Sequence, residues 1–308
     1  MNKFIIGIDV GATNTKIGLI KAWSYKVIYR TVFGTRNYIR RKNILIKTLT
    51  SKIESLLQEN HLFKNQILAI GLGLPGPIDC HKGIVHFLPN IPGWKEVPIK
   101  RILEQRLKIP VFVDNDVNLI TLAEWRLGAG SGIRNLLCIT LGTGVGGGLI
   151  LDNKLYRGAH FLAGEIGHMP INETGPLCNC GGFACLERYV GNKYILSAAG
   201  KIFKKNNLTL EKLSLLSEKG NNQAIKIWQD VGRRIGVALS GAVNLLNLER
   251  IIIGGGVSLA GKPLWLAIRK TVQQRAMPNQ ARQVKIVRSK LGLDAGILGA
   301  AVLTRERF

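Results

Sequence analysis

Short apolar runs alternate with glycine-rich turns and with segments of helical periodicity along the whole chain. An apolar run over residues 4–8 ends at Asp9, and a glycine turn and two further apolar runs follow it. Apolar residues recur at helical spacing between residues 43 and 60, and another apolar run from residue 67 leads into a loop rich in glycine and proline. This order of strands, turns and helices predicts an α/β protein.

The second half of the chain repeats the theme. Residues 97–108 predict an amphipathic helix, residues 110–116 a strand that ends in carboxylates, and residues 117–130 a helix closed by glycine. Residues 135–156 then read as strand, glycine-rich turn and strand, as at the start of the chain. Helical periodicity from about residue 193 to 247 precedes a third glycine loop and two further strands and helices. The repetition predicts an internally duplicated architecture.

Length and charge narrow the class of protein. The chain has 308 residues, which favours two domains or one large α/β unit. Lysine and arginine number 43 against 19 acidic residues, a formal net charge of +24. Such a charge attracts nucleic acid, membranes or anionic substrates. The basic residues are scattered, however, so we expect no specific nucleic-acid partner and a field that favours a phosphate-bearing ligand.

The cysteines and the start of the chain exclude other classes. Five cysteines in a chain of this length do not make a secreted disulfide scaffold. The first apolar run is too short for the core of a signal peptide, and no later apolar segment is long enough to cross a bilayer. We therefore expect a cytoplasmic protein without a membrane partner.

Glycine loops are the first candidates for phosphate binding. Residues 71–76 and 142–147 match G-x-G-x-x-G, but neither opens a helix, as a dinucleotide fingerprint requires, and a Walker A sequence is absent. The hairpin turn between Asp9 and Lys16 could instead offer backbone N–H groups and hydroxyls to phosphate, with Asp9 holding a hydrated magnesium ion. A plain hairpin turn stays open for either hairpin alone. A second glycine hairpin and a third glycine loop favour the phosphate interpretation.

Three cysteines and one histidine form a second cluster. Cys178, Cys180 and Cys185 follow His168 within one stretch of the chain. One imidazole and three thiolates are the ligand set of a closed structural zinc site. A redox motif would have the spacing C-x-x-C, and a nucleic-acid-binding zinc knuckle would be a short isolated module. The spacing therefore favours a structural zinc clip.

Two acids lie at the end of the predicted strand 110–116. Alternation along a strand would place Asp114 and Asp116 on one side and Asn115 on the other. Asp116 also precedes a helix, where a carboxylate is commonly only an N-cap. From the residues alone, a catalytic acid and a helix cap both remain open.

The motifs together resemble a known family. The stretches "DVGATNTK", "LGTGVGGG" and "GGGVS" are similar to the two phosphate loops and the adenosine loop of the nucleotide-binding fold of actin, hexokinase and heat-shock chaperones. The cysteine loop and the other motifs narrow the resemblance to the ROK family of repressors, open reading frames and kinases, which includes bacterial glucokinases. It covers nearly the whole chain.

This resemblance implies a fold. It implies an α/β, two-domain actin-like ATPase (ribonuclease H-like) fold with a cleft between duplicated domains. The N-terminal domain would span residues 1–117 and be joined by the C-terminal helix 294–308. The C-terminal domain would span residues 118–293.

The resemblance also implies roles for individual residues. Asp116 would be the general base, with Asp114 the lesser candidate. The sugar would contact Gly73, Asn90, Asn115, Asp116, Glu165, His168 and Glu187. ATP and its phosphates would contact Asp9, Gly11, Thr13, Asn14, Thr15, Lys16, Thr143, Gly144, Gly254, Gly255 and Gly256. Zinc on His168, Cys178, Cys180 and Cys185 would hold the loop that carries Glu165 and Glu187 without joining the chemistry.

The activity implied is the transfer of phosphate from Mg-ATP to a hexose, glucose to glucose 6-phosphate being the expected reaction. Kinases of N-acetylglucosamine, N-acetylmannosamine or fructose share the same motifs and stay open. A repressor or sugar sensor is disfavoured, because only eight residues precede Asp9 and leave no room for a DNA-binding domain. A homodimer, or a tetramer, is expected. Two departures from the family pattern are Ala184, in place of a glycine, and Gly191, in place of a serine.

Overall fold

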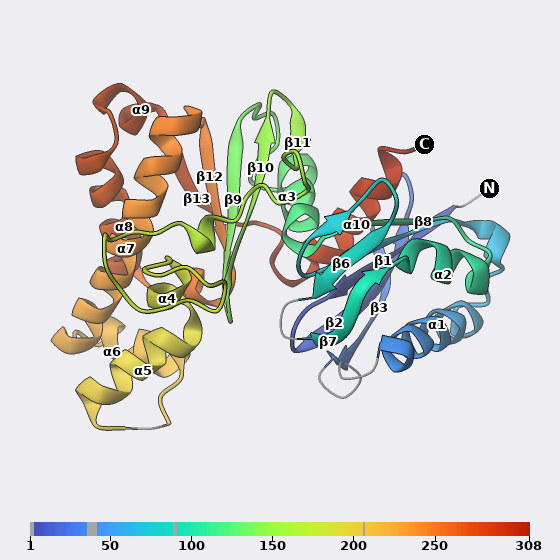
Figure 1. Cartoon of the computed structure of the whole chain (residues 1–308), viewed down its shortest axis with the longest axis horizontal. Coiled ribbons are helices and arrows are strands. Elements are labelled where there is room, and N and C mark those ends of the chain that lie inside the picture. The colour runs from blue at the N-terminus through green and yellow to red at the C-terminus, as the bar shows by residue number, and fades with distance from the viewer. Residues whose placement is uncertain (1–2, 36–41, 89–90, 206) are drawn as a thin grey trace. The chain divides into compact units, whose positions relative to one another are not determined.

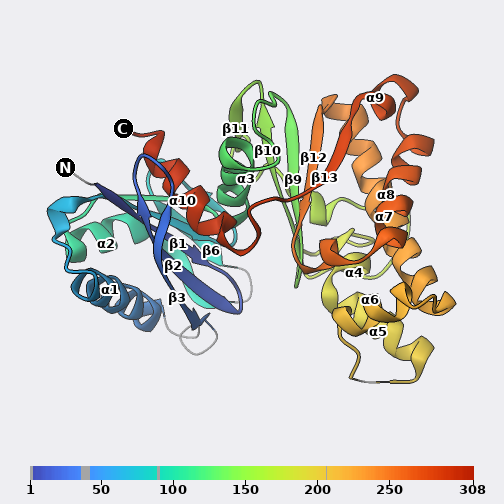
Figure 2. The ribbon, with the colours of Figure 1, turned by 180° about the vertical axis from the view of Figure 1, so that it is seen from behind.

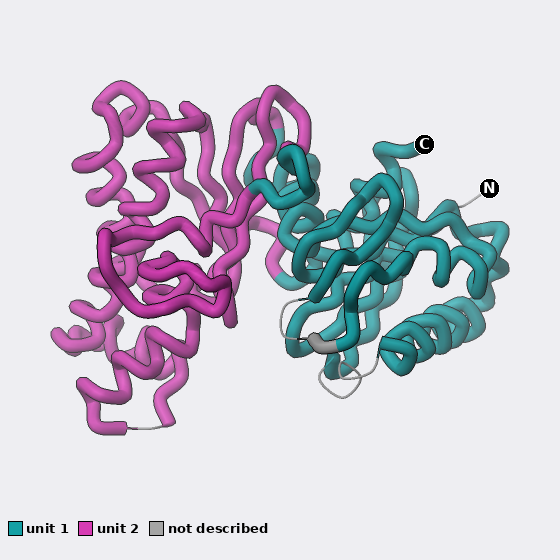
Figure 3. Tube along the Cα trace, in the orientation of Figure 1, with its two compact units in different colours: residues 1–131, 157–163, 293–308 teal, residues 132–156, 164–292 magenta. Residues whose placement is uncertain are grey.

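The structure, a computed structural model, describes residues 3–35, 42–88, 91–205 and 207–308. Its contacts divide the chain into two compact units (Figure 3). Unit 1 comprises Met1–Ser131, Arg157–Ala163 and Leu293–Phe308, and unit 2 comprises Gly132–Tyr156 and Gly164–Gly292. The C-terminal segment thus belongs with the N-terminal unit. The domain boundary after residue 117 stays a prediction.

Unit 1 is built on a five-stranded sheet in the order β3-β2-β1-β4-β8 (Figure 1). Its strands are β1 (Phe4–Val10), β2 (Asn14–Lys21), β3 (Val27–Gly34), β4 (Ile67–Leu74) and β8 (Val111–Asn115). β1, β2 and β3 pair antiparallel, whereas β1, β4 and β8 pair in parallel. The carboxyl ends of β1, β4 and β8 therefore lie at one edge of the sheet.

Helices cover both faces of this sheet, as Figure 2 shows from behind. They are α1 (Lys42–Glu59), η2 (Lys64–Gln66), α2 (Ile99–Leu107), α3 (Asp116–Leu127) and α10 (Ala295–Arg305), preceded by the short turn η5 (Gly292–Asp294). A small antiparallel sheet adds β5 (Ile78–Asp79), β6 (Ile84–Leu88) and β7 (Ile91–Val97). Alternate residues of β1 face opposite ways, so Ile6 and Ile8 pack with α1 and α2 while Ile5 packs with α10.

The sheet of unit 2 has the order β11-β10-β9-β12-β13. Its strands are β9 (Leu136–Leu141), β10 (Val145–Leu151), β11 (Lys154–Tyr156), β12 (Arg250–Gly254) and β13 (Lys285–Arg288). β9, β10 and β11 pair antiparallel, and β9, β12 and β13 pair in parallel. The two sheets therefore have the same topology, which confirms the internal duplication predicted from the sequence.

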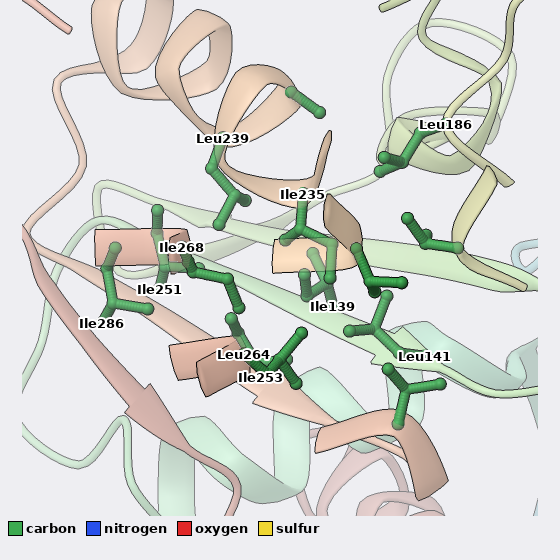
Figure 4. Close-up of a cluster of buried hydrophobic side chains, with 14 of the residues drawn as sticks. Ile139, Leu141, Leu186, Ile235, Leu239, Ile251, Ile253, Leu264, Ile268 and Ile286 are labelled. Carbon is green, nitrogen blue, oxygen red and sulfur yellow. The ribbon is translucent and has the colours of Figure 1, made fainter. Parts of the chain in front are cut away.

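The helices of unit 2 close a large apolar core (Figure 4). They are η3 (Ile166–His168), α4 (Glu187–Val190), α5 (Asn192–Phe203), α6 (Leu210–Glu218), α7 (Asn222–Leu246), η4 (Gly256–Leu259), α8 (Lys262–Arg275) and α9 (Pro278–Gln283). Ile235 and Leu239 of α7 and Ile268 of α8 pack with Ile139 and Ile251 of the sheet. Among the described residues, no helix has the length and apolarity required to cross a membrane.

Candidate active site

The hairpin between β1 and β2 forms the first predicted phosphate loop. Gly11 N–H donates to the Asn14 carbonyl over 3.0 Å, which closes a tight turn. The side chains of Thr13 and Asn14 are exposed, as a phosphate-binding turn requires. Thr15 is fully buried, and its hydroxyl pairs with that of Thr35 at 2.9 Å. Thr15 thus holds the hairpin together, and its hydroxyl is engaged within the protein.

Asp9, the last residue but one of β1, lies in a crowded, polar environment. The Lys16 Nζ lies 3.7 Å from Asp9 Oδ2 and donates to the Leu293 carbonyl over 3.0 Å. A methyl group added to Gly296, in the first turn of α10, would lie 2.5 Å from Asp9 Cγ. Burial raises the pKa of Asp9, and Lys16 opposes this shift. A carboxylate that is only partly compensated is a suitable ligand for a hydrated cation.

The junction of β8 and α3 carries the predicted base. β8 ends at Asn115, and Asp116 is the first residue of α3. Asn115 is the N-cap, because its side chain accepts from Val117 N–H at 2.9 Å and Asn118 N–H at 3.2 Å. The alternative that Asp116 is the cap is therefore wrong. Asp116 Oδ1 also accepts from Val117 N–H at 2.9 Å, so its carboxylate lies at the positive end of the helix.

Asp114, the lesser candidate, is enclosed in the protein. Its side chain is 2% exposed and accepts from Arg157 Nε at 2.8 Å and Nη2 at 2.6 Å. Asn118 Nδ2 and the backbone N–H of Asn115 donate to its other oxygen at 3.0 and 2.8 Å. Burial tends to lower the pKa of Arg157, but Asp114 more than offsets this and the pKa is raised. Asp114 is thus a fully paired structural carboxylate.

Two other predicted sugar contacts lie in unit 1. Gly73, in β4, packs against the start of α3: a methyl group there would lie 3.3 Å from the Cα of Asp116 and 2.7 Å from Leu119 Cδ1. Asn115 Nδ2 donates to the Gly76 carbonyl over 3.2 Å. Asn90 lies outside the described residues. The structure therefore brings Gly73, Asn115 and Asp116 together within one unit.

In unit 2, the turn between β9 and β10 is the second predicted phosphate loop. Gly142 N–H donates to the Gly144 carbonyl over 2.9 Å, and Thr143 is exposed at the tip. Glu187 Oε2, at the start of α4, accepts from Val145 N–H at 2.9 Å. A methyl group on Gly144 would lie 2.6 Å from that same oxygen. Glu187 is therefore placed against the predicted phosphate loop, a position that its sequence did not reveal.

Glu165 lies near Glu187 and His168. Its Oε2 is 3.9 Å from His168 Nε2. Burial raises the pKa of Glu165, His168 lowers it and Glu187 raises it further. The three predicted sugar contacts of unit 2 thus form one polar group beside the turn 142–145.

His168, Cys178, Cys180 and Cys185 form the cluster that the sequence predicted. Their ligand atoms all lie within 4.8 Å of one another. Cys178 Sγ is 3.7 Å from His168 Nδ1, and Cys180 Sγ is 3.7 Å from Cys185 Sγ. In a tetrahedral site with Zn–S bonds of about 2.3 Å, two sulfur ligands are separated by about 3.8 Å. The four residues therefore fit zinc.

The thiols of this cluster differ in acidity. Burial and hydrogen bonds from the neighbouring cysteines raise the pKa of Cys185 to about 12, while the Gly182 N–H lowers the pKa of Cys180. Thiolates are the ligands of zinc, so a bound cation would have to displace the Cys185 proton. The Nδ1 of His168 faces the cysteines and Nε2 faces Glu165, an arrangement that fixes the ring orientation.

Two positions depart from the family pattern. Ala184 is fully buried and has a φ of 55°, so alanine occupies a left-handed position that suits glycine. Gly191 lies beside the turn 142–145, where a methyl group would be 3.2 Å from the Thr143 carbonyl and 3.0 Å from the Glu187 carbonyl. A serine at Gly191 would crowd both carbonyls in this backbone conformation.

The third glycine loop follows β12. Gly254 is buried against Ser289, while Gly255 and Gly256 are exposed. Gly255 has a φ of 85° and approaches the backbone of Leu141 so closely that a methyl group would lie 2.6 Å from its nitrogen. Only glycine satisfies both conditions. The loop thus presents bare backbone next to the strand that precedes Thr143.

Comparisons with known proteins agree with these features. A model of the ROK family matches residues 5–307. The glucokinase of Halalkalibacterium halodurans is 34% identical to this chain over an alignment of 321 positions, which covers 99% of this chain and 96% of that protein. The xylose repressor of Caldicellulosiruptor bescii is 30% identical over 311 residues, covering 97% of this chain and 77% of the repressor.

The chain belongs to the ROK family. A solved ROK family glucokinase from Streptomyces griseus, in complex with glucose and AMPPNP, matches with a TM-score of 0.84 and 28% identity over 98% of this chain and 99% of that one. The α/β actin-like ATPase fold predicted from the sequence is thereby confirmed. The family contains both sugar kinases and repressors, so membership alone does not choose between the two activities.

Sequence reasoning missed two residues beside the predicted base. Arg157 and Asn118 both bind the carboxylate of Asp114. Arg157 is a single arginine after a strand, and Asn118 lies within an apolar helix pattern. Neither belongs to a sequence motif that would indicate a contact with Asp114. Only the fold shows that they share one partner.

Proposed function

We propose that this ROK protein is an ATP-dependent hexose kinase that converts glucose to glucose 6-phosphate, with Asp116 as the general base. The observation that carries the proposal is the carboxylate of Asp116 at the N-terminus of α3, beside Gly73 and distinct from the buried, fully paired Asp114. Full-length similarity to a glucokinase supports the same activity.

In the proposed reaction, Asp116 accepts the proton of a hexose hydroxyl as that oxygen attacks the γ-phosphorus of ATP. The bond from phosphorus to the β–γ bridging oxygen breaks, and ADP leaves with the electron pair. Such transfers depend on positioning and on charge stabilisation. Backbone N–H groups of Ala12–Asn14 and Thr143–Gly144, within the two turns, are suited to the phosphates, and Gly255–Gly256 to the nucleoside. Magnesium, when bound, would neutralise phosphate charge, with Asp9 as its carboxylate.

Unit 2 supplies further proposed contacts. Glu165, His168 and Glu187 form a group of hydrogen-bonding side chains of the kind that ring hydroxyls require. Zinc, when bound by the cluster, would supply rigidity: it would fix His168 and the loop that ends at Glu187. We also propose that the protein forms a homodimer, or a tetramer, in solution.

The test is a coupled assay of ADP release with glucose, mannose, fructose, N-acetylglucosamine and N-acetylmannosamine. We expect turnover with glucose to have the highest kcat/KM. Asp116→Asn should abolish turnover while leaving glucose binding, measured by calorimetry, largely intact. The control is Asp152→Asn, the same change at an exposed turn, which should keep full activity.

Other outcomes separate the alternatives. A preference for an N-acetylhexosamine or fructose would keep the kinase and correct the substrate. Sugar binding without turnover on any of the five sugars would favour a repressor or sugar sensor, and a xylose repressor is among the similar proteins. An active Asp116→Asn variant would remove Asp116 from its role.

A further inference from the structure

A charged residue from a distant segment supports the strand end that precedes Asp116. The chain leaves unit 2 at Tyr156, contributes Arg157–Ala163 to unit 1, and returns to unit 2 at Gly164. The first residue of this excursion, Arg157, donates two hydrogen bonds to one carboxylate oxygen, Oδ2, of Asp114. The Arg157 side chain is 20% exposed and that of Asp114 is 2% exposed, so water screens the pair weakly.

The carboxylate of Asp114 joins three parts of unit 1. One oxygen accepts both Arg157 donors, and the other accepts Asn118 Nδ2 at 3.0 Å and Asn115 N–H at 2.8 Å. Asn118 lies in the first turn of α3, and Asn115 is the cap of that helix. Residues on both sides of Asp116 are therefore tied to one carboxylate, Asn115 by its backbone N–H and Asn118 by its side chain, and Arg157 balances the charge of that carboxylate.

Stability alone is a weak reason for such a pair. Burying two charges costs several kcal/mol of desolvation for each ion, and apolar replacements of buried ion pairs are often neutral or stabilising. Directional hydrogen bonds, in contrast, fix geometry. The arrangement at Asp114 fixes the turn that carries Asp116, and a group that abstracts a proton must be held within a narrow range of positions.

We infer that Arg157 is a positioning residue, which holds Asp116 in place through Asp114. This inference rests on the proposed function, in which Asp116 is the base. Arg157 itself is not assigned any contact with a substrate. The other ionisable groups around the pair are Asp79, Cys80, Glu306 and Arg307, none of which hydrogen-bonds to Asp114 among the contacts of the described residues.

The test compares Arg157→Gln with Arg126→Gln. Arg126 pairs with Glu306 at 2.9 Å at the far end of the same helix, so the control removes an ion pair from α3 without touching Asp114. We expect Arg157→Gln to lower kcat by about tenfold or more, since a displacement of about 1 Å can cost up to 10²-fold. The KM for ATP should stay within twofold, and Arg126→Gln should keep the wild-type kcat.

A second measurement does not depend on activity. Hydrogen exchange at the amides of Val117 and Asn118, which Asn115 caps, should be faster in Arg157→Gln than in wild type, with amides of β12 as the internal reference. If Arg157→Gln does not fold, Arg157→Lys keeps the charge without the paired donors and should show an intermediate kcat and intermediate exchange.

Two results would overturn the inference. One is a folded Arg157 variant with wild-type kcat, and the other is unchanged exchange at Val117 and Asn118. A wild-type protein that phosphorylates no hexose would instead contradict the proposed function, and the exchange experiment would still decide whether Arg157 holds the turn.

Discussion

Gly299 in α10 provides a quantitative test of how α3 is held. A methyl group at Gly299 would overlap the carbonyl of Leu119 and lie 2.9 Å from its Cα, so the obstruction is backbone that cannot rotate away. Overpacking of this kind costs about 1–3 kcal/mol, with rigid neighbours toward the upper end. Against this cost, alanine stabilises a helix by about 1 kcal/mol relative to glycine. Gly299→Ala should therefore destabilise unit 1 by about 2 kcal/mol.

This loss is measurable by thermal unfolding followed by circular dichroism. For a domain of 150–250 residues, about 1 kcal/mol shifts Tm by about 2–4 °C, so a decrease of about 4–8 °C is expected. Leu119 lies one turn after Asp116, so displacement of α3 should also lower kcat. The matched control is Gly241→Ala in α7, where the nearest atom is the flexible Met169 Cε at 3.4 Å. Gly241→Ala should raise Tm, and an equal rise for Gly299→Ala would refute the backbone contact between α10 and α3.

Three further predictions follow from single residues. The folded pKa of Asp9 is raised above its ordinary 3.8, so the native state binds a proton more tightly than the unfolded chain, and stability falls as pH rises from about 3.8 through the folded pKa. Asp9→Asn should therefore have a higher Tm than wild type at neutral pH, and this difference should disappear below pH 3.8. The variant should also lose turnover. A lower Tm at neutral pH would contradict the conclusion that burial disfavours the ionised carboxylate of Asp9. Cys178→Ser should lose zinc in elemental analysis and lower the Tm, whereas wild type purified without zinc would contradict the clip. Ala184→Gly should change the free energy of unfolding by less than about 1 kcal/mol. Relief of about 1–2 kcal/mol of strain in the left-handed backbone is offset by the loss of a buried methyl group, worth about 0.8 kcal/mol, and by a more flexible unfolded chain. Chemical denaturation measures the change, and a loss of stability above about 2 kcal/mol would contradict this estimate.

The fold was predictable because its signals are local. Apolar runs that end in glycine turns predicted both hairpins and their repetition, and the common strand order of the two sheets confirms the duplication. The cysteine cluster was predictable for the same reason, since His168, Cys178, Cys180 and Cys185 lie within one short stretch and converge in the structure. The role of Thr15 was less visible, because only the pairing of β2 with β3 shows that its hydroxyl meets Thr35.

The contact of Asp114 with Arg157 could not be predicted, because it joins residues 43 positions apart that belong to no shared sequence pattern. Strand alternation treated Asp114 and Asp116 as equivalent. Because β8 ends at Asn115, the two acids differ in their surroundings. The carboxylate of Asp114 is bound within the protein, whereas Asp116 is the first residue of α3. Burial and partners, which depend on the whole of unit 1, show that Asp114 is engaged within the structure, and Asp116 stays the proposed base, as the resemblance implied.

The two equivalent outer strands of the duplicated sheets end differently, and only one of them leads into the candidate base. β8 and β13 occupy the same place in their sheets, each at the outer edge beyond the central parallel strands. β8 leads through Asn115 into Asp116, whereas β13 ends at Arg288, whose guanidinium lies over the ring of Trp265. Equivalent topology thus gives each sheet a glycine hairpin, whereas of the two outer edge strands β8 alone leads into the acid that we propose as the base. The proposed reaction needs one proton acceptor and one phosphate chain, so a repeated sheet with unequal strand ends is compatible with it.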